Sequence, residues 1–436
     1  DRTPTLEDIH LGDWMMEYED RVGAVGRPTL TARFVLFSAV ALSASRLVVF
    51  LVRYGIPNTA SDFLGSWPAP RLAEWFGKTD GFYSGLVTDW HEGTSWSYGP
   101  ILHLVTIPLF IFSDRGTAYR FLLFVVAGGF VVTGLLLVWY LRKELPNHYA
   151  LAGLIFVVFN FAPALEALGQ RNVELLELLL ISAAFVTFGR RRDTATGLLV
   201  GLAAGVKYLP AVLIPALFLA RRQRAGTVSL MTLAVIAIVT QLTLGWQNNL
   251  LLRTVVDVDS EINFFDHPQN QAISGFIMRA VGGEGNESTG ITISIVMIIF
   301  AGSALCFWLW SRRGSSDWPI QWSILLTSVL LLIPHGESYY LCLLIPPFAI
   351  AFSRLCGMGR TWKWVLFSVA YSVVAWPVPM SIVEAVVNSV VGRHIWLFQW
   401  THEKSIPMIG ALILLFLLLS LHDPERLTVS DTTESP

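Results

Sequence analysis

Residues 33–67 read RFVLFSAVALSASRLVVFLVRYGIPNTASDFLGSW, an apolar run of membrane-spanning length followed closely by a carboxylate, Asp62. About 20 consecutive apolar residues cross a bilayer as a helix. A carboxylate just outside such a span is costly near lipid and usually has a function. The stretch predicts a membrane protein that keeps a chemically active group at the bilayer surface.

Composition indicates the broad class of the chain. Of its 436 residues, 54% are hydrophobic and only 14% are charged, and the mean hydropathy is +0.57. Soluble domains usually carry about 25% charged residues. The formal net charge of −2 gives no indication of nucleic-acid binding. We expect an all-α polytopic membrane protein, in which the three cysteines are buried thiols rather than a disulfide framework.

Apolar windows predict about twelve transmembrane helices in one bundle. The shorter stretch Pro100–Phe112 fits either a short span or a helix along the membrane interface. If it is interfacial, the arginine clusters all fall on the face that carries the N-terminal tail, which the positive-inside rule makes cytoplasmic. The predicted spans are residues 33–53, 119–141, 148–165, 173–189, 195–208, 210–220, 227–245, 290–311, 318–334, 339–354, 362–380 and 405–421.

This topology divides the chain into a cytoplasmic tail (1–30), a transmembrane domain (31–422) and a second cytoplasmic tail (423–436). No signal-peptide-like run precedes the first span, so we expect a retained anchor. The polar, non-basic segments all fall on the opposite, non-cytoplasmic face. Such a gathering of polar groups is more typical of an enzyme than of a channel.

The first outer loop holds Asp62 without a nearby basic residue, so its carboxylate could accept a proton from a sugar or lipid hydroxyl. Tryptophans of this loop, such as Trp67, are often interface anchors. Asp89, His91 and Glu92 could ligate a divalent cation, but they lack an Asp-x-Asp pattern, which favours a solvated loop.

Two intramembrane features lie further along the chain. Glu174 and Glu177 are one helical turn apart in an apolar stretch, so both can face the bundle interior, with Arg171 or Lys207 as partners. Pro210 breaks the helix after Lys207 and places this lysine at an outer turn. There it either snorkels to the interface or meets a phosphate as a point charge.

Two more outer segments carry polar side chains. In His267-Pro268-Gln269-Asn270-Gln271, amides suit sugar hydroxyls because they both donate and accept, although a plain structured loop is also possible. A short amphipathic helix ending near Arg279 is expected to follow. His335 and Glu337 either bind a hydroxylated ligand or form a local pair.

Taken in order, these segments resemble the polyprenyl-phosphate-mannose-dependent mannosyltransferase-like family of the glycosyltransferase-C superfamily. The resemblance is carried by six weak motifs over about residues 33–350. They are Asp62-Phe63 with Trp67, Tyr98-Gly99-Pro100, Gly169-Gln170 with Asn172, Gly201 and Gly205 with Lys207 and Pro210, Asn270-Gln271 with Gly275 and Arg279, and Pro334 with Tyr339-Tyr340. Arg171 and Gly99 depart from the family pattern, which leaves the sugar and the acceptor open.

The resemblance implies a glycosyltransferase-C-like bundle whose long first extracytoplasmic loop carries juxtamembrane helices. It implies inverting transfer of a sugar, mannose first and arabinose as another candidate, from a polyprenyl-phosphate donor to a glycolipid, polysaccharide or glycan acceptor. Asp62 would be the base, and Lys207, Arg279 and Arg71 would hold the donor phosphate. The sugar or acceptor pockets would be lined by Trp67, Tyr98, Gln170, Asn172, His267, Asn270, Gln271, His335 and Glu337.

The resemblance also implies a multi-pass protein of the cell (plasma) membrane with its active site on the non-cytoplasmic face. The lipid-linked sugar is a substrate, so no soluble cofactor is required, no metal site is assigned, and dependence on a divalent metal stays open. A membrane transporter or lipid flippase is the main alternative, because Glu174, Glu177 and Glu384 are ionisable groups in apolar surroundings. A non-catalytic subunit of a glycan-assembly complex is the third.

Overall fold

The computed structural model describes residues 29–54, 115–170, 172–244, 267–282, 286–312, 317–333, 336–358, 360–377, 380–391 and 396–422. The regular structure of these segments is helical, apart from one β-bridge that joins Asn270 to Glu337. The expected all-α class is confirmed.

The helices follow one another with short connections within most of the described segments. They are α2 (Leu30–Tyr54), α7 (Arg115–Leu141), η4 (Arg142–Glu144), α8 (His148–Phe159), α9 (Ala162–Gly169), α10 (Glu174–Gly189), α11 (Asp193–Val206), η5 (Leu209–Val212), α12 (Leu213–Leu219), α13 (Gln223–Leu244), α16 (Ile273–Val281), α17 (Glu287–Ser311), α18 (Trp318–Leu332), η7 (Ser338–Leu344), α19 (Ile345–Cys356), α20 (Thr361–Ala375), α21 (Met380–Val391), α22 (Leu397–Glu403) and α23 (Ile406–Leu421).

Membrane embedding is supported by length and apolarity. Within the described residues, five helical stretches are long and apolar enough to cross a bilayer: Leu30–Val52, Arg120–Glu144, His148–Gly169, Glu287–Ser311 and Ser338–Cys356. Every other predicted span coincides with a shorter apolar helix. Twelve crossings stay a prediction, because several of these helices have only 14 to 16 residues.

The predicted span 148–165 is interrupted rather than continuous. Asn160 leaves the helical conformation, and Pro163, which has no N–H to donate, begins the next helix. The Tyr371 hydroxyl lies 3.1 Å from the carbonyl oxygens of both Val157 and Asn160 and can donate to either. This contact satisfies backbone groups that the break leaves without helical partners.

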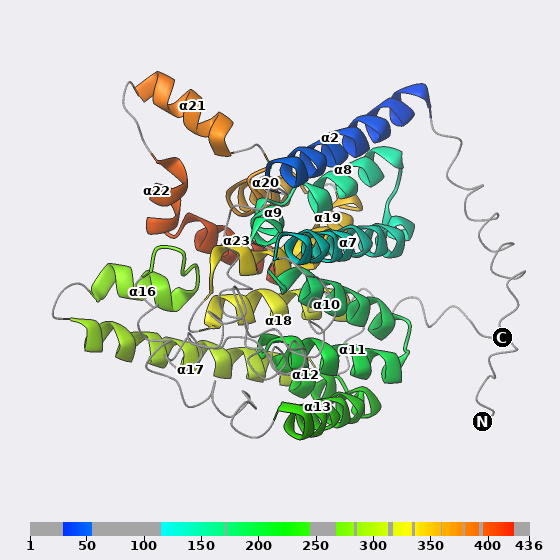
Figure 1. Cartoon of the computed structure of the whole chain (residues 1–436), viewed down its shortest axis with the longest axis vertical. Helices are drawn as coiled ribbons and strands as arrows, with labels where there is room; N and C mark the ends of the chain where they lie inside the picture. Colours follow the sequence, from blue (N-terminus) through cyan, green and yellow to red (C-terminus); the bar gives the residue numbers. More distant parts are fainter. Residues whose placement is uncertain are drawn as a thin grey trace, which may run out of the picture.

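The centre and the periphery of the bundle differ in burial. In the most apolar window of each span, 89% of the residues are buried for η7–α19, against 6% for α2 and 11% for α17. The η7–α19 segment is therefore the central element, whereas α2 and α17 lie at the edges. Figure 1 shows α7, α10, α11 and α13 following one another through the bundle, an order that their contacts confirm.

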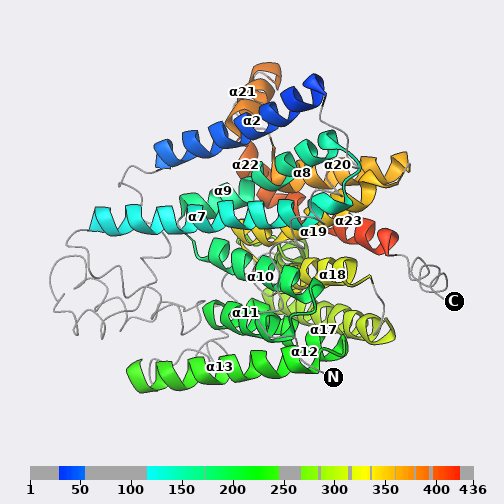
Figure 2. The same cartoon turned by 90° about the vertical axis from the view of Figure 1, so that its right-hand side faces the viewer.

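The ends of α10 define two faces of the molecule. Its 16 residues rise by 1.5 Å each, so Glu174 and Gly189 lie roughly 24 Å apart along the axis. In Figure 2, α7 runs nearly horizontally and α10 lies beside it at a slant. Glu174 belongs to the end that sequence analysis assigned to the non-cytoplasmic side, and Arg190 to the arginine-bearing end. Two further helices, α21 and α22, lie between the predicted spans 362–380 and 405–421, apart from the first residue of α21.

Candidate active site

Lys207 owes its position to a break between two helices. Helix α11 ends at Val206, and Lys207 is extended, with φ −148° and ψ 148°. Pro210 lies at the start of the 3-10 turn η5, where the missing N–H of a proline is tolerated. The expected break at this proline is confirmed. Lys207 does not snorkel outward, because only 1% of the residue is exposed.

The Lys207 ammonium forms an ion pair with the Glu174 carboxylate at the first residue of α10. Its Nζ also lies 3.7 Å from the centroid of the Tyr340 ring, which η7 contributes. A cation over an aromatic face is attracted by the ring quadrupole. Three elements distant in sequence thus meet at one buried cation. Of the two partners that the sequence suggested for Glu174, the structure gives Lys207, and Arg171 lies outside the described residues.

Glu177 adds a second carboxylate to this cluster. It lies three residues after Glu174 on α10 and is fully buried, as predicted. Neither of its carboxylate oxygens has a hydrogen-bond partner among the described residues. A buried carboxylate without partners is costly. The cluster of Glu174, Glu177, Lys207 and Tyr340, called here the lysine cluster, contains more acidic than basic groups.

Asn270 ties the loop before α16 to the segment before η7. Its side-chain oxygen accepts hydrogen bonds from the backbone N–H groups of Gly336, at 3.0 Å, and Ala272, at 3.1 Å. The adjacent Gln271 N–H donates to the Gly336 carbonyl at 2.6 Å. A glycine at position 275 permits this arrangement, because a Cβ there would clash with the Asn270 backbone oxygen. Asn270 is therefore engaged in holding backbone rather than facing solvent.

Arg279 also holds the loop before α16 in place. Its guanidinium donates to the carbonyls of His267 and Asn270, both at 2.8 Å, and to the Ser405 hydroxyl. The expected helix ending near this arginine is present as α16. Gln271 adds a bond from its side-chain nitrogen to the His402 carbonyl at 3.1 Å. These side chains join the loop before α16 to the junction between α22 and α23.

The other predicted residues among the described segments lie just before α10, α16 and η7. Gln170 caps α9, and its buried side-chain oxygen has no hydrogen-bond partner in the described part of the chain. Asn172 is buried, and its side-chain oxygen accepts from the Val173 N–H at 2.7 Å. His267 is exposed, whereas Glu337 is half-buried and pairs with Asn270 through the backbone bridge.

Sequence reasoning missed one carboxylate in this region. Glu166 of α9 accepts a hydrogen bond from the Ser338 hydroxyl at 2.8 Å, which joins α9 to η7. The signal was available, because Glu166 is a lone acidic residue in an apolar stretch, as Glu174 and Glu177 are.

Several predicted site residues lie outside the described residues: Asp62, Trp67, Arg71, Tyr98 and His335, and with them the loop residues Asp89, His91 and Glu92. Their roles stay predictions. Within the segments that are described, no group of three His, Cys, Asp or Glu side chains is arranged to hold a metal ion. The described site is therefore a buried ion pair with a surplus carboxylate, together with a loop whose backbone is fixed by amides and an arginine.

The sequence model of glycosyltransferase family 87 matches residues 96–334, more than half of the chain. The chain belongs to glycosyltransferase family 87. Together with its apolar helices, this membership makes it a membrane glycosyltransferase. The matched region contains Lys207, Glu174, Glu177, Asn270 and Arg279, and it begins after Asp62.

Two further comparisons complete the picture. A solved structure similar to this chain is the crystal structure of ArnT from Cupriavidus metallidurans in the apo state, with 17% identity and a TM-score of 0.41 over 88% of this chain and 76% of that one. No curated protein sequence matches the chain.

Proposed function

We propose that this glycosyltransferase transfers a sugar, mannose in the first instance, from a polyprenyl-phosphate donor to a glycolipid, polysaccharide or glycan acceptor at the non-cytoplasmic face of the membrane. The observation that carries the proposal is the lysine cluster. A buried ammonium fixed between a carboxylate and an aromatic ring lies at the end of α10 opposite the arginine-bearing face.

The proposed reaction is a single displacement with inversion. The Asp62 carboxylate takes the proton of the acceptor hydroxyl while that oxygen bonds to the anomeric carbon of the sugar. The bond from this carbon to the phosphate oxygen breaks, and the polyprenyl phosphate leaves with the electron pair. Negative charge develops on the phosphate, so a nearby cation accelerates the step by stabilising the departing group.

Lys207 is the cation proposed for that task. Glu174 holds the ammonium in position through the ion pair, and the phosphate would share the ammonium with this carboxylate. Arg279 is already bound to two backbone carbonyls and a hydroxyl. We accordingly assign it the role of holding the loop 267–272 in place, and we keep Arg71 as a second candidate for the phosphate.

The amide side chains complete the proposal on the sugar side. Gln170 and Gln271 each have a buried side-chain oxygen without a hydrogen-bond partner among the described residues. A buried acceptor of this kind is costly unless a donor arrives, and sugar hydroxyls are donors. These two residues, with Asn172, His267, Asn270, His335, Glu337, Trp67 and Tyr98, are the proposed lining of the sugar and acceptor pockets.

The test uses the purified full-length protein in lipid bilayers with synthetic polyprenyl-phosphate sugars and a glycolipid acceptor. Transfer by the wild type, together with loss of transfer in Lys207→Met, is the expected result. Lys363→Met is the matched control, because Lys363 is also a buried lysine but bonds the Ser420 carbonyl between α20 and α23. Equal losses in the two variants would assign the effect to folding and overturn the role of Lys207.

A further inference from the structure

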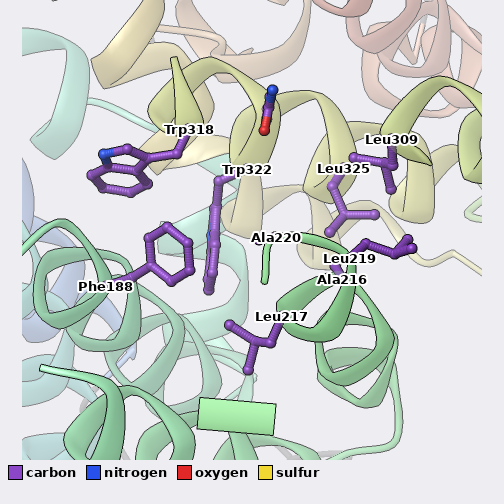
Figure 3. Close-up of a pocket in the computed structure, with 10 residues that line it drawn as sticks. Phe188, Ala216, Leu217, Leu219, Ala220, Leu309, Trp318, Trp322 and Leu325 are labelled. Carbon is purple, nitrogen blue, oxygen red and sulfur yellow. The ribbon is translucent and has the colours of Figure 1, made fainter. Parts of the chain in front are cut away.

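Far from the lysine cluster, the arginine-bearing end of the bundle contains an apolar slot. Counted together with the open space at its mouth it measures about 450 Å³, and it lies between α10, α12, α17 and α18. Figure 3 shows Phe188, Trp318 and Trp322 on one side of it, with Leu217, Leu309 and Leu325 around the remainder. The ring centroids of Phe188 and Trp322 are 5.7 Å apart. Apart from Gln321 the lining residues are apolar, which suits a hydrocarbon chain.

One polar atom in this wall lacks a partner. The indole N–H of Trp322 is buried and has no acceptor among the described residues, although Trp322 is 94% buried and lines the slot. Buried tryptophan N–H groups normally find a hydrogen-bond acceptor. An occupant that brings an oxygen to this wall, such as the ester carbonyl of a lipid, would satisfy it.

Arginines lie close in sequence to the residues that line the slot. Three of the helices that line it end at arginines: Arg190 follows α10, Arg221 comes two residues after the end of α12, and Arg312 follows α17. Arg221 comes directly after the lining residue Ala220, and Arg312 three residues after the lining residue Leu309. Both side chains are exposed, and neither has an ion-pair partner in the described segments.

A neighbouring arginine, Arg222, contacts the aromatic wall of the slot directly. The Arg222 guanidinium lies 4.8 Å from the centroid of the Phe188 ring and donates to Asp193 at 2.9 Å. Arg222 is thereby neutralised and fixed in place, whereas Arg221 and Arg312 leave uncompensated charge. Apolar walls with unpaired arginines close by in sequence match the two halves of an anionic lipid.

We propose that this slot binds an anionic glycerophospholipid of the leaflet that faces the arginine-bearing side. One acyl chain would lie against Phe188, Trp318 and Trp322, an ester oxygen would accept from the Trp322 N–H, and Arg221 and Arg312 would bind the headgroup phosphate. The site is distinct from the proposed catalytic centre, because it lies at the opposite end of α10. The enzyme would therefore bind a second lipid, an anionic glycerophospholipid, in addition to its lipid-linked donor substrate.

The experiment measures retention of phosphatidylglycerol and of phosphatidylcholine with matched chains by native mass spectrometry of the purified full-length protein. Tighter retention of phosphatidylglycerol is expected. Arg221→Gln with Arg312→Gln should weaken it about thirtyfold, on the scale of roughly 1 kcal/mol per arginine near a bilayer surface. Arg360→Gln, on an exposed arginine at the start of α20, is the matched control and should change nothing.

A second variant tests the wall. Trp322→Phe keeps an aromatic ring but removes the N–H, and it should weaken both lipids about fivefold, as expected for one neutral hydrogen bond. Phosphatidylglycerol carrying a photoactivatable acyl chain should label α12 and α18. Equal retention of the two lipids, an equal effect of Arg360→Gln, labelling elsewhere, or displacement by equimolar polyprenyl phosphate would each overturn the proposal.

Discussion

Lys207 and Glu174, 33 residues apart in sequence, form an ion pair in which neither side chain is more than 2% exposed. Burying two charges costs several kcal/mol each, and only their mutual attraction and further hydrogen bonds offset that cost. Such a pair adds little net stability to the folded protein. A functional role at the site explains its presence more readily. The predictions below concern this ion pair, the nearby Glu177, and the packing of α16 against the loop before it.

The first prediction separates the stability of the pair from its function. Lys207→Met should destabilise the protein by about 3–5 kcal/mol, because it leaves Glu174 buried and unpaired. Adding Glu174→Gln should recover most of that loss, since no uncompensated charge remains at this pair, but it should not restore glycosyl transfer. Thermal denaturation in detergent and a transfer assay on the same preparations measure both quantities. Recovery of transfer in the double variant would argue against the phosphate-binding role.

The second prediction concerns the surplus carboxylate. Glu177→Gln should leave the melting temperature unchanged or raise it, because neither oxygen of Glu177 has a hydrogen-bond partner in the described segments and the amide carries no charge. Glu174→Gln should lower it, because that change removes half of an ion pair. Comparing the two melting temperatures tests the assignment. If Glu177→Gln proved the more destabilising of the two, Glu177 would need a partner that the described residues do not contain.

The third prediction tests whether Arg279 holds the loop 267–272 in place or binds the donor phosphate directly. A lysine keeps the charge but cannot donate at once to the carbonyls of His267 and Asn270 and to Ser405. Arg279→Lys should therefore be about as impaired as Arg279→Gln in melting temperature, with a cost of about 1–3 kcal/mol. A lysine variant with normal stability and normal donor KM would favour direct phosphate binding instead.

The fourth prediction tests the close approach of α16 to its preceding loop. Gly275→Ala should destabilise by about 1–3 kcal/mol, because the new Cβ would clash with the Asn270 backbone oxygen and lie 2.7 Å from Asn270 Cγ. Gly302→Ala on α17 is the matched control. It has nothing within 4 Å of the new methyl group, and alanine favours the helix by about 1 kcal/mol. Similar melting temperatures for the two variants would contradict the described packing.

Much of the fold could be predicted because apolar periodicity and prolines act locally. The runs of apolar residues predicted α7, α8 and the helices from α10 to α13, and Pro210 predicted the break that positions Lys207. The pairing of Lys207 with Glu174 was one of two options, because an intramembrane carboxylate needs a partner. The interruption at Asn160 was not predicted, since it depends on Tyr371 from a distant helix.

The hydrogen bonds of the amides and of Arg279 could not be predicted from composition. Asn270 and Gln271 suggested sugar binding, yet most of the hydrogen bonds observed for them hold backbone, including that of Gly336, 66 residues away. Such bonds depend on which loops meet, and the sequence pattern does not contain that information. The apolar slot could not be predicted either, because four separate helices each contribute part of its wall.

The central claim is that a base assists sugar transfer from a lipid-phosphate donor. Substitution of Asp62, the proposed base, tests this claim most directly. The measurement is the initial rate of sugar transfer by purified protein in bilayers from polyprenyl-phosphate mannose and, in parallel, from polyprenyl-phosphate arabinose. The account predicts transfer from one donor with inversion at the anomeric carbon, and a fall of at least about a hundredfold in Asp62→Asn, the scale of general-base catalysis. Undiminished transfer in Asp62→Asn, or transfer with retention, would contradict it.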